Sequence, residues 1–328
     1  MSTPYALTMP PDIDPHAEIE VARLAERLGY TDVWNGEVSG ADGVVSMAAA
    51  ALSTERVRLG TGILNVYSRS PFVLAMASAS LQNLSRGRFC LGIGTSSPRI
   101  VAEWHGLEFD QPLTRIRNTV AALRTLLAGE RCDLEALRLR GARLTLPPRD
   151  PVPIFLAALG PKMLRLAGEV GDGVMVNFVA PSDIPEVVQE LAVGRERSGR
   201  TATEVIARVF LPYPGDDDAA IDTVREIIAN YTTAPVYRAL MERIGFSKQV
   251  KASLAARAQR DRVGARRAID DEMVQALAIV GSPAEQRNRL AEYVAGGADV
   301  AMLTFFHRPL PEDERVALTL EAIELFRP

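Results

Sequence analysis

Short apolar runs alternate with longer amphipathic stretches along most of the chain. Each run has the length of a buried strand, and in the stretches that follow the apolar residues recur at helical spacing. Prolines, glycines and Ser or Asp residues separate the two patterns, as expected at helix ends. The predicted strands are Tyr5–Met9, Asp32–Asn35, a run beginning at Val57, Arg88–Gly94, Pro151–Ala157, a run ending at Asn177, Glu204–Leu211 and Asp299–Phe305.

This regular alternation predicts parallel strands joined by crossover helices. Eight strand-helix units favour a (β/α)8 barrel, with an open doubly wound sheet as the alternative. The alternation is lost at about residues 213–281, where Arg-rich helical pieces form an insertion before the last strand. Because the insertion lacks linker composition, we expect a single domain over residues 1–328.

The stretch from Val57 to Pro71 contains the most informative departure from the strand pattern. Gly60 and Gly62 interrupt it, and glycine inside a strand marks a bulge or a close approach of a ligand to the main chain. A helix and another strand follow at once. Since ligands of such crossover units bind beyond the carboxyl ends of the strands, we expect Gly62, Asn65 and Gly94 to face one site.

Two segments of this region carry a family resemblance. Residues 60–71 read Gly-Thr-Gly-Ile-Leu-Asn-Val-Tyr-Ser-Arg-Ser-Pro, and residues 84–94 read Leu-Ser-Arg-Gly-Arg-Phe-Cys-Leu-Gly-Ile-Gly. They resemble the luciferase-like monooxygenase superfamily, in particular its branch of oxidoreductases that use the deazaflavin coenzyme F420. The resemblance implies a TIM barrel of the bacterial luciferase-like type, hydride transfer at C5 of the deazaflavin, a homodimer, and a non-proline cis peptide at Gly62-Ile63 behind the central ring.

Three segments are the candidate cofactor site. The loop after Gly94 has hydroxyl and backbone N–H groups that can bind a phosphate or a ring carbonyl; alternatively, its small residues serve only tight packing. The loop lacks the third glycine of a dinucleotide-binding fingerprint, so we do not expect a Rossmann site. At Gly160-Pro-Lys162 a helix N-terminus and a lysine attract anions, or the segment only caps the helix. With the bulge implied by the resemblance, the candidates are Gly62, Ile63, Leu64, Asn65, Gly94, Thr95, Ser96, Ser97, Ala158, Leu159, Gly160 and Lys162.

The candidate catalytic residues are Glu37, His105 and Asn65. In the family, the acidic counterpart of Glu37 is often followed by a histidine base, where this chain has Val38, and Ser97 replaces a glutamate acid of the sugar-phosphate dehydrogenases. Both departures favour reduction of an activated C=C or C=N bond. His105 either donates a proton to the substrate or is a structural histidine, and Asn65 is suited to the polar edge of the ring.

Composition narrows the possible partners. Hydrophobic residues make up 47% of the chain, charged residues 24%, and the net charge is -4, which argues against nucleic-acid binding. Two cysteines are too few for a disulfide framework, and no apolar run is long enough to span a membrane, so we expect a cytoplasmic protein. The three histidines are scattered, so we expect no metal site. The expected partner is a small-molecule substrate. The insertion's arginines form a solvated face or attract the acidic tail of F420. An FMN-dependent monooxygenase and a non-catalytic binding protein are the alternative functions.

Overall fold

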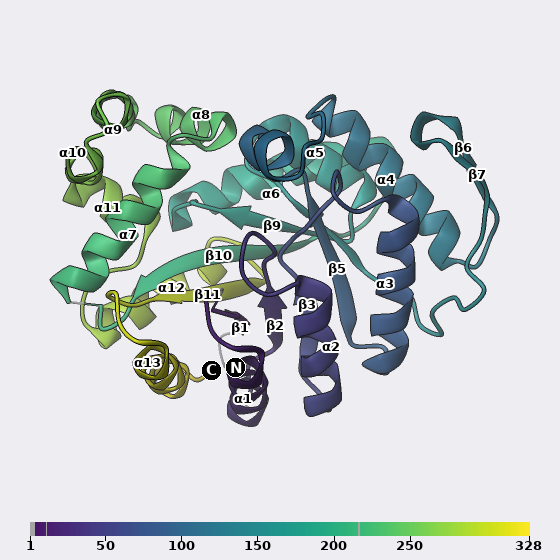
Figure 1. The fold of residues 1–328 in the computed structure, drawn as a ribbon, viewed down its shortest axis with the longest axis horizontal. Helices are drawn as coiled ribbons and strands as arrows, with labels where there is room; N and C mark the ends of the chain where they lie inside the picture. Colours follow the sequence, from purple (N-terminus) through teal and green to yellow (C-terminus); the bar gives the residue numbers. More distant parts are fainter. Residues whose placement is uncertain (1–3, 11, 216) are drawn as a thin grey trace.

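The computed structural model describes residues 4–10, 12–215 and 217–328. Its parallel strands close into a barrel with the helices outside (Figure 1), and β3 pairs with both β2 and β5 to complete the ring. The eight-stranded barrel is therefore confirmed, and the open-sheet alternative is wrong. In sequence order the strands of the barrel are β1 (Tyr5–Thr8), β2 (Asp32–Asn35), β3 (Arg58–Thr61), its continuation β4 (Leu64–Asn65), β5 (Phe89–Gly94), β8 (Ile154–Ala157), β9 (Gly173–Asn177), β10 (Glu204–Pro212) and β11 (Val300–Phe306).

The outer helices begin where the sequence places its capping residues. Asp14, Asp42, Ser70 and Ser282 each accept a backbone N–H in the first turn of the helix that follows, which satisfies donors that a helix end leaves free. The outer helices are α1 (Pro15–Leu28), α2 (Gly43–Ser53), α3 (Pro71–Leu84), α4 (Pro112–Leu127), α5 (Pro161–Val170), α6 (Ile184–Ser198), α12 (Pro283–Ala295) and α13 (Glu312–Leu325).

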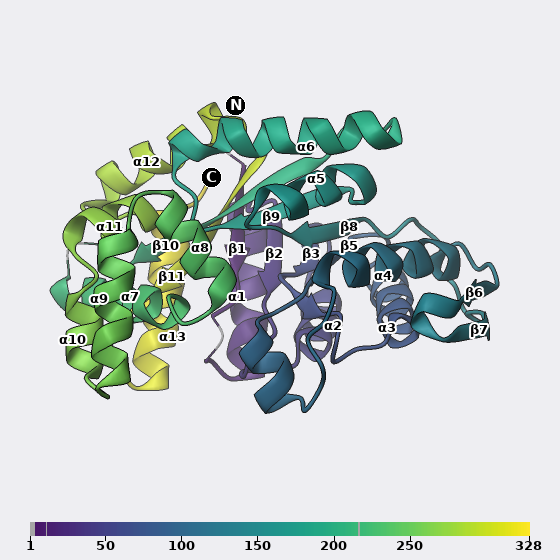
Figure 2. The ribbon, with the colours of Figure 1, turned by 90° about the horizontal axis from the view of Figure 1, so that it is seen from above.

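The insertion between β10 and β11 is helical. Its apolar side chains form a cluster of their own, which includes Phe178 and Phe210 from the barrel strands and their loops, so the helices pack over the ends of β9 and β10. Figure 2 shows them gathered on one side of the barrel. They are α7 (Asp218–Tyr231), α8 (Pro235–Arg243), α9 (Ser247–Ala258), α10 (Arg262–Arg267) and α11 (Asp271–Leu277).

Three smaller elements were not expected from the sequence. A π-helix, η1 (Ile100–Trp104), follows β5, and an antiparallel hairpin, β6 (Cys132–Leu134) with β7 (Leu139–Ala142), follows α4. The hairpin lies away from the barrel mouth at the far end of α4 (Figure 2).

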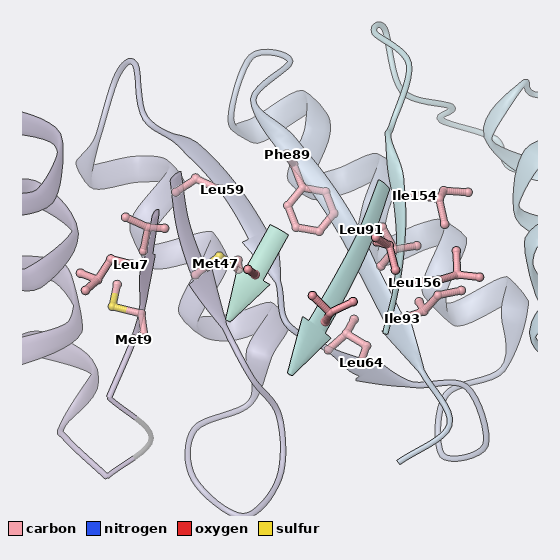
Figure 3. Packing of buried hydrophobic residues seen from close by; sticks show 14 of the residues in the cluster. Leu7, Met9, Met47, Leu59, Leu64, Phe89, Leu91, Ile93, Ile154 and Leu156 are labelled. Carbon is pink, nitrogen blue, oxygen red and sulfur yellow. The ribbon is translucent and has the colours of Figure 1, made fainter. Parts of the chain in front are cut away.

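The main apolar core lies between the barrel wall and the outer helices. Side chains such as Leu7, Leu59 and Leu91 leave their strands on this side and are fully buried (Figure 3). A second set fills the barrel itself, and Gly60 makes room for it: a Cβ there would lie 2.1 Å from the ring of Trp34. This interior set consists of Ala6, Trp34, Cys90, Phe155, Met175, Ile206, Val300 and Met302.

An ion cluster closes the amino ends of the strands. Arg58 contacts the buried carboxylate of Asp32 and both oxygens of Glu204, which are the first residues of β2 and β10. Its guanidinium also lies 5.6 Å from the ring centre of Phe155. The floor of the barrel is thus sealed by paired charges, and the opposite end is left for a site.

Candidate active site

The interior positions at the carboxyl ends of the strands differ between the two halves of the barrel. Side chains alternate along a strand, so residues two or four positions after a member of the interior set point the same way, and on β3 the count starts from Gly60, which faces the ring of Trp34. On four consecutive strands, β2, β3, β5 and β8, these positions form a small half: Gly36, Gly62, Gly94 and Ala157. On the other four, β9, β10, β11 and β1, they form a polar half: Asn177, Arg208, Thr304 and Thr8.

In the small half the backbone itself forms the surface. A Cβ at Gly36 would lie 2.8 Å from the carbonyl oxygen of Gly62, and a Cβ at Gly94 would lie 2.9 Å from Cδ1 of Ile63. The third strand is interrupted between Thr61 and Leu64, as the glycine pattern predicts, and the Gly62-Ile63 peptide is cis, as the resemblance implies. None of the four residues of the small half has a side chain larger than a methyl group. The side chain of Ile63 packs against one of them, Gly94.

Asn65 lies beside this surface with one unused donor. Its Oδ1 accepts a hydrogen bond from the backbone N–H of Tyr67 at 2.9 Å, and its backbone pairs with Gly94. The Nδ2 group is buried and has no partner among the described residues. Since an unsatisfied buried donor costs about 1–3 kcal/mol, this amide is suited to a ligand acceptor.

Glu37 is held by protein groups. Its Oε2 accepts hydrogen bonds from a terminal nitrogen of Arg69 at 2.7 Å and from the backbone N–H of Gly43, at the start of α2, at 3.1 Å, and its Oε1 accepts one from Nε of Arg69 at 3.3 Å. Arg69 also pairs with Asp42, and its hydrogen bond to Glu37 raises the pKa of the guanidinium above its usual range. Both oxygens of Glu37 are therefore engaged, and the side chain is placed to orient Arg69 and the start of α2.

The loop after β5 turns sharply away from the barrel. Ser96 has a left-handed backbone with φ 56°, and Oγ of Ser97 accepts the backbone N–H of Ile100 at 3.3 Å, at the start of η1. Thr95 and Ser96 stay half-buried next to Gly94. This arrangement leaves the loop next to the small half.

The third segment of the predicted cofactor site follows β8. Gly160 is the N-cap of α5, a Cβ there would meet no atom within 4 Å, and Lys162 is exposed. Ala158 and Leu159 line a cavity of about 250 Å³ on the outer side of the barrel wall, between β8, β9, α6 and α8. Its charged lining residues are Asp183, Glu186 and Arg243.

His105 is separate from these groups. It is exposed at the end of η1, next to the half-exposed Trp104, and no hydrogen bond or ion pair connects its side chain to another described residue. The structure thus gathers Glu37 and the segments at residues 62–65, 94–97 and 158–162 at the ends of four consecutive strands. It leaves His105 on the surface.

The polar half was missed by the sequence analysis. A signal was present: Arg208 is a lone charged residue in the middle of the apolar run of β10. The sequence alone does not show which face of the strand Arg208 occupies. The structure shows it, because Ile206, two residues earlier, points into the barrel.

The parallel barrel, its sealed floor and its glycine-lined carboxyl face have the architecture of a barrel enzyme, in which the site lies at the carboxyl ends of the strands. The chain belongs to the luciferase-like monooxygenase family, whose model matches residues 2–300. This membership and the enzyme class confirm the predictions from the sequence. Among the described residues, no helix has the length and apolar character needed to cross a membrane.

Individual relatives extend over most of the chain. A 5,10-methylenetetrahydromethanopterin reductase of Methanolobus tindarius is 32% identical over 83% of this chain and 84% of its own length. A putative coenzyme F420-dependent oxidoreductase of Mycobacterium tuberculosis is 32% identical over 88% of this chain and 90% of its own. The structure of the coenzyme F420-dependent tetrahydromethanopterin reductase from Methanopyrus kandleri has a TM-score of 0.81 at 24% identity, covering 99% of this chain and 97% of its own.

Proposed function

We propose that the protein is a coenzyme F420-dependent oxidoreductase that reduces an activated C=C or C=N bond of a small organic substrate. Its sequence relatives support both parts of this proposal: one is named as a reductase and another as a putative F420-dependent oxidoreductase. When bound, F420 supplies the hydride from its C5 position. The protein supplies orientation, a surface for the ring and a proton.

One observation carries the cofactor assignment: closely packed backbone at Gly36, Gly62 and Gly94, without side chains of its own, next to an unpartnered amide. Gly36, Gly62 and Gly94 let neighbouring segments pack closely, so backbone atoms form a flat wall, and Nδ2 of Asn65 has no partner among the described residues. A ring system with polar edges matches both features, because it packs flat on the backbone and accepts the free N–H.

The remaining predicted segments suit the acidic part of the cofactor. The backbone N–H and the exposed ammonium of Lys162, in the first turn of α5, favour an anion near Gly160, where the backbone is uncovered. We propose that residues 158–162 hold the phosphate-bearing tail, and residues 94–97 the polar groups next to the ring.

The surroundings of Glu37 support reduction over oxidation of an alcohol. Oxidation needs a free base near the ring, whereas this carboxylate is bonded to Arg69 and to the N–H of Gly43, and Val38 is exposed hydrocarbon. Reduction needs a proton donor. We propose His105 for this role. Because it lies on the surface, η1 and the residues that follow it would have to fold over the bound substrate.

Separate titrations with F420 and with FMN test the proposal. We expect binding of F420 and, with reduced F420, turnover of enones or imines, followed by the return of the absorbance of the oxidised cofactor. Binding of FMN alone, with oxygen-dependent product formation, would support a monooxygenase instead. Binding of F420 without turnover across enones, imines, carbonyls and alcohols would indicate a non-catalytic binder. The homodimer, the single domain and the cytoplasmic location stay predictions.

A further inference from the structure

Arg208 places an unpaired cation in the polar half of the barrel mouth. It lies on β10, two residues after the interior residue Ile206, and its side chain is half-buried. None of the ion pairs between described residues includes it, and its two terminal nitrogens make no hydrogen bond to them. The terminal nitrogens are not among the buried unsatisfied atoms, so they face solvent, and a cation held in the mouth of the barrel attracts an anion.

The protein holds this side chain in one orientation. Nε donates to Oγ1 of Thr304 at 3.0 Å, and that hydroxyl donates to Oγ1 of Thr8 at 2.9 Å, which fixes it to β11 and β1. The guanidinium carbon lies 5.2 Å from the ring centre of Phe210. Because Nε is occupied, the free edge of the guanidinium is the pair of terminal nitrogens, which binds a carboxylate with two parallel hydrogen bonds.

No acidic group among the described residues pairs with Arg208. Asn177, next to it on β9, donates to the hydroxyl of Tyr237 at 3.4 Å, and burial raises the pKa of that tyrosine, so the phenol stays neutral. The other members of the polar half are hydroxyls. The cation is therefore available to a ligand that enters the mouth.

We infer that Arg208 binds an acidic group of the substrate, a carboxylate or a comparable anion, on the half of the mouth that lies across from the ring surface. The inference rests on the proposed function, since it assigns the small half to the cofactor and the polar half to the substrate. It narrows the substrate to an unsaturated or imino compound that carries a negative charge.

Calorimetric titrations with acid and amide pairs test this assignment. The protein, saturated with oxidised F420 so that no reduction occurs, is titrated with crotonate and crotonamide, and with cinnamate and cinnamamide. We expect the wild type to bind at least one acid 10-fold or more tightly than its amide. Arg208→Gln should abolish this preference, and Arg208→Lys should retain part of it. Arg260→Gln, which removes an exposed arginine, should leave it unchanged.

Each outcome decides the inference. It is overturned by a wild type without preference for either acid, by a preference that survives Arg208→Gln, or by an equal loss in Arg260→Gln. A loss of F420 affinity in Arg208→Gln would assign the residue to the cofactor and also overturn it, while leaving the proposed function intact. If the wild type fails to bind F420, the proposed function fails, and the same titrations on the unloaded protein still report on Arg208.

Discussion

Adding a single methyl group at Gly94 tests the ring surface. In Gly94→Ala the new Cβ would lie 2.9 Å from Cδ1 of Ile63 and 3.2 Å from Cβ of Ala157. Carbon atoms prefer about 3.5–4.0 Å, so the tip of Ile63 must move by roughly 0.6–1 Å toward the space assigned to the ring. Because a flexible tip can move, we expect the unfolding free energy to fall by less than about 1.5 kcal/mol.

The cofactor should lose more than the fold does. A gap of about 0.5–1 Å removes a quarter to a half of each dispersion contact, which over roughly 20 contacts of about 0.15 kcal/mol amounts to about 1 kcal/mol. F420 affinity should therefore drop about fivefold in a fluorescence titration. Adding Ile63→Val deletes Cδ1 but keeps Cγ1, which lies 3.0 Å from the new Cβ, so it should restore part of the affinity. Unchanged affinity in Gly94→Ala, or a loss that Ile63→Val does not relieve, would refute the assignment of this surface to the ring.

Three further changes test the floor, the turn at residues 55–57 and the proposed anion site. Arg58→Met leaves the buried Asp32 without its cation and should lower the unfolding free energy by about 3–5 kcal/mol in denaturant titrations. Glu26 is partly buried, which raises its pKa, but hydrogen bonds from the backbone N–H groups of residues 55–57 outweigh this and hold the pKa below its usual range. The ionised carboxylate therefore stabilises the fold above about pH 4.3, and this stabilisation is lost as the pH falls through the folded-state pKa. We expect Glu26→Gln to be less stable than the wild type by about 1–2 kcal/mol at pH 7, and this difference should shrink in acid. Lys162→Gln should weaken F420 binding several-fold at low salt and less at high salt.

Each of these three changes has its own control. Arg140→Met removes an exposed arginine and should change the unfolding free energy by less than about 0.5 kcal/mol. If Arg58→Met changes it by no more than this, the ion cluster at the floor does not stabilise the fold as argued. A Glu26→Gln difference that persists below pH 3 would contradict a role for the carboxylate charge. Equal weakening by Lys162→Gln at all salt concentrations would show that the lysine does not act through its charge.

The sequence predicts most of the barrel because burial imposes a regular pattern on it. Strands such as Arg88–Gly94 are apolar runs closed by glycine, and helices such as Pro71–Leu84 begin with a cap and a proline, so both follow from local chemistry. The hairpin at residues 132–142 could not be found in this way. Its strands are short, partly exposed and interspersed with charged residues, and they lack the alternation that burial on one face produces.

The site could be predicted only where it is built from backbone. The glycines at positions 62 and 94 leave a signal in the sequence, because their missing side chains are the feature itself. The partner of Glu37 lies 32 residues away, and the direction of Arg208 depends on the register of β10. These are properties of the closed barrel, which no local pattern encodes.

The division of the mouth into a small half and a polar half separates two evolutionary tasks. The proposed cofactor surface comes from the second to fifth barrel strands, β2, β3, β5 and β8. The polar half comes from β1 and the last three strands, with the insertion packed over two of them. Exchanges at Thr8, Asn177, Arg208 and Thr304 can thus retune substrate choice without disturbing the ring surface. A library restricted to those four positions is the shortest route to redirecting this catalyst toward new acceptors.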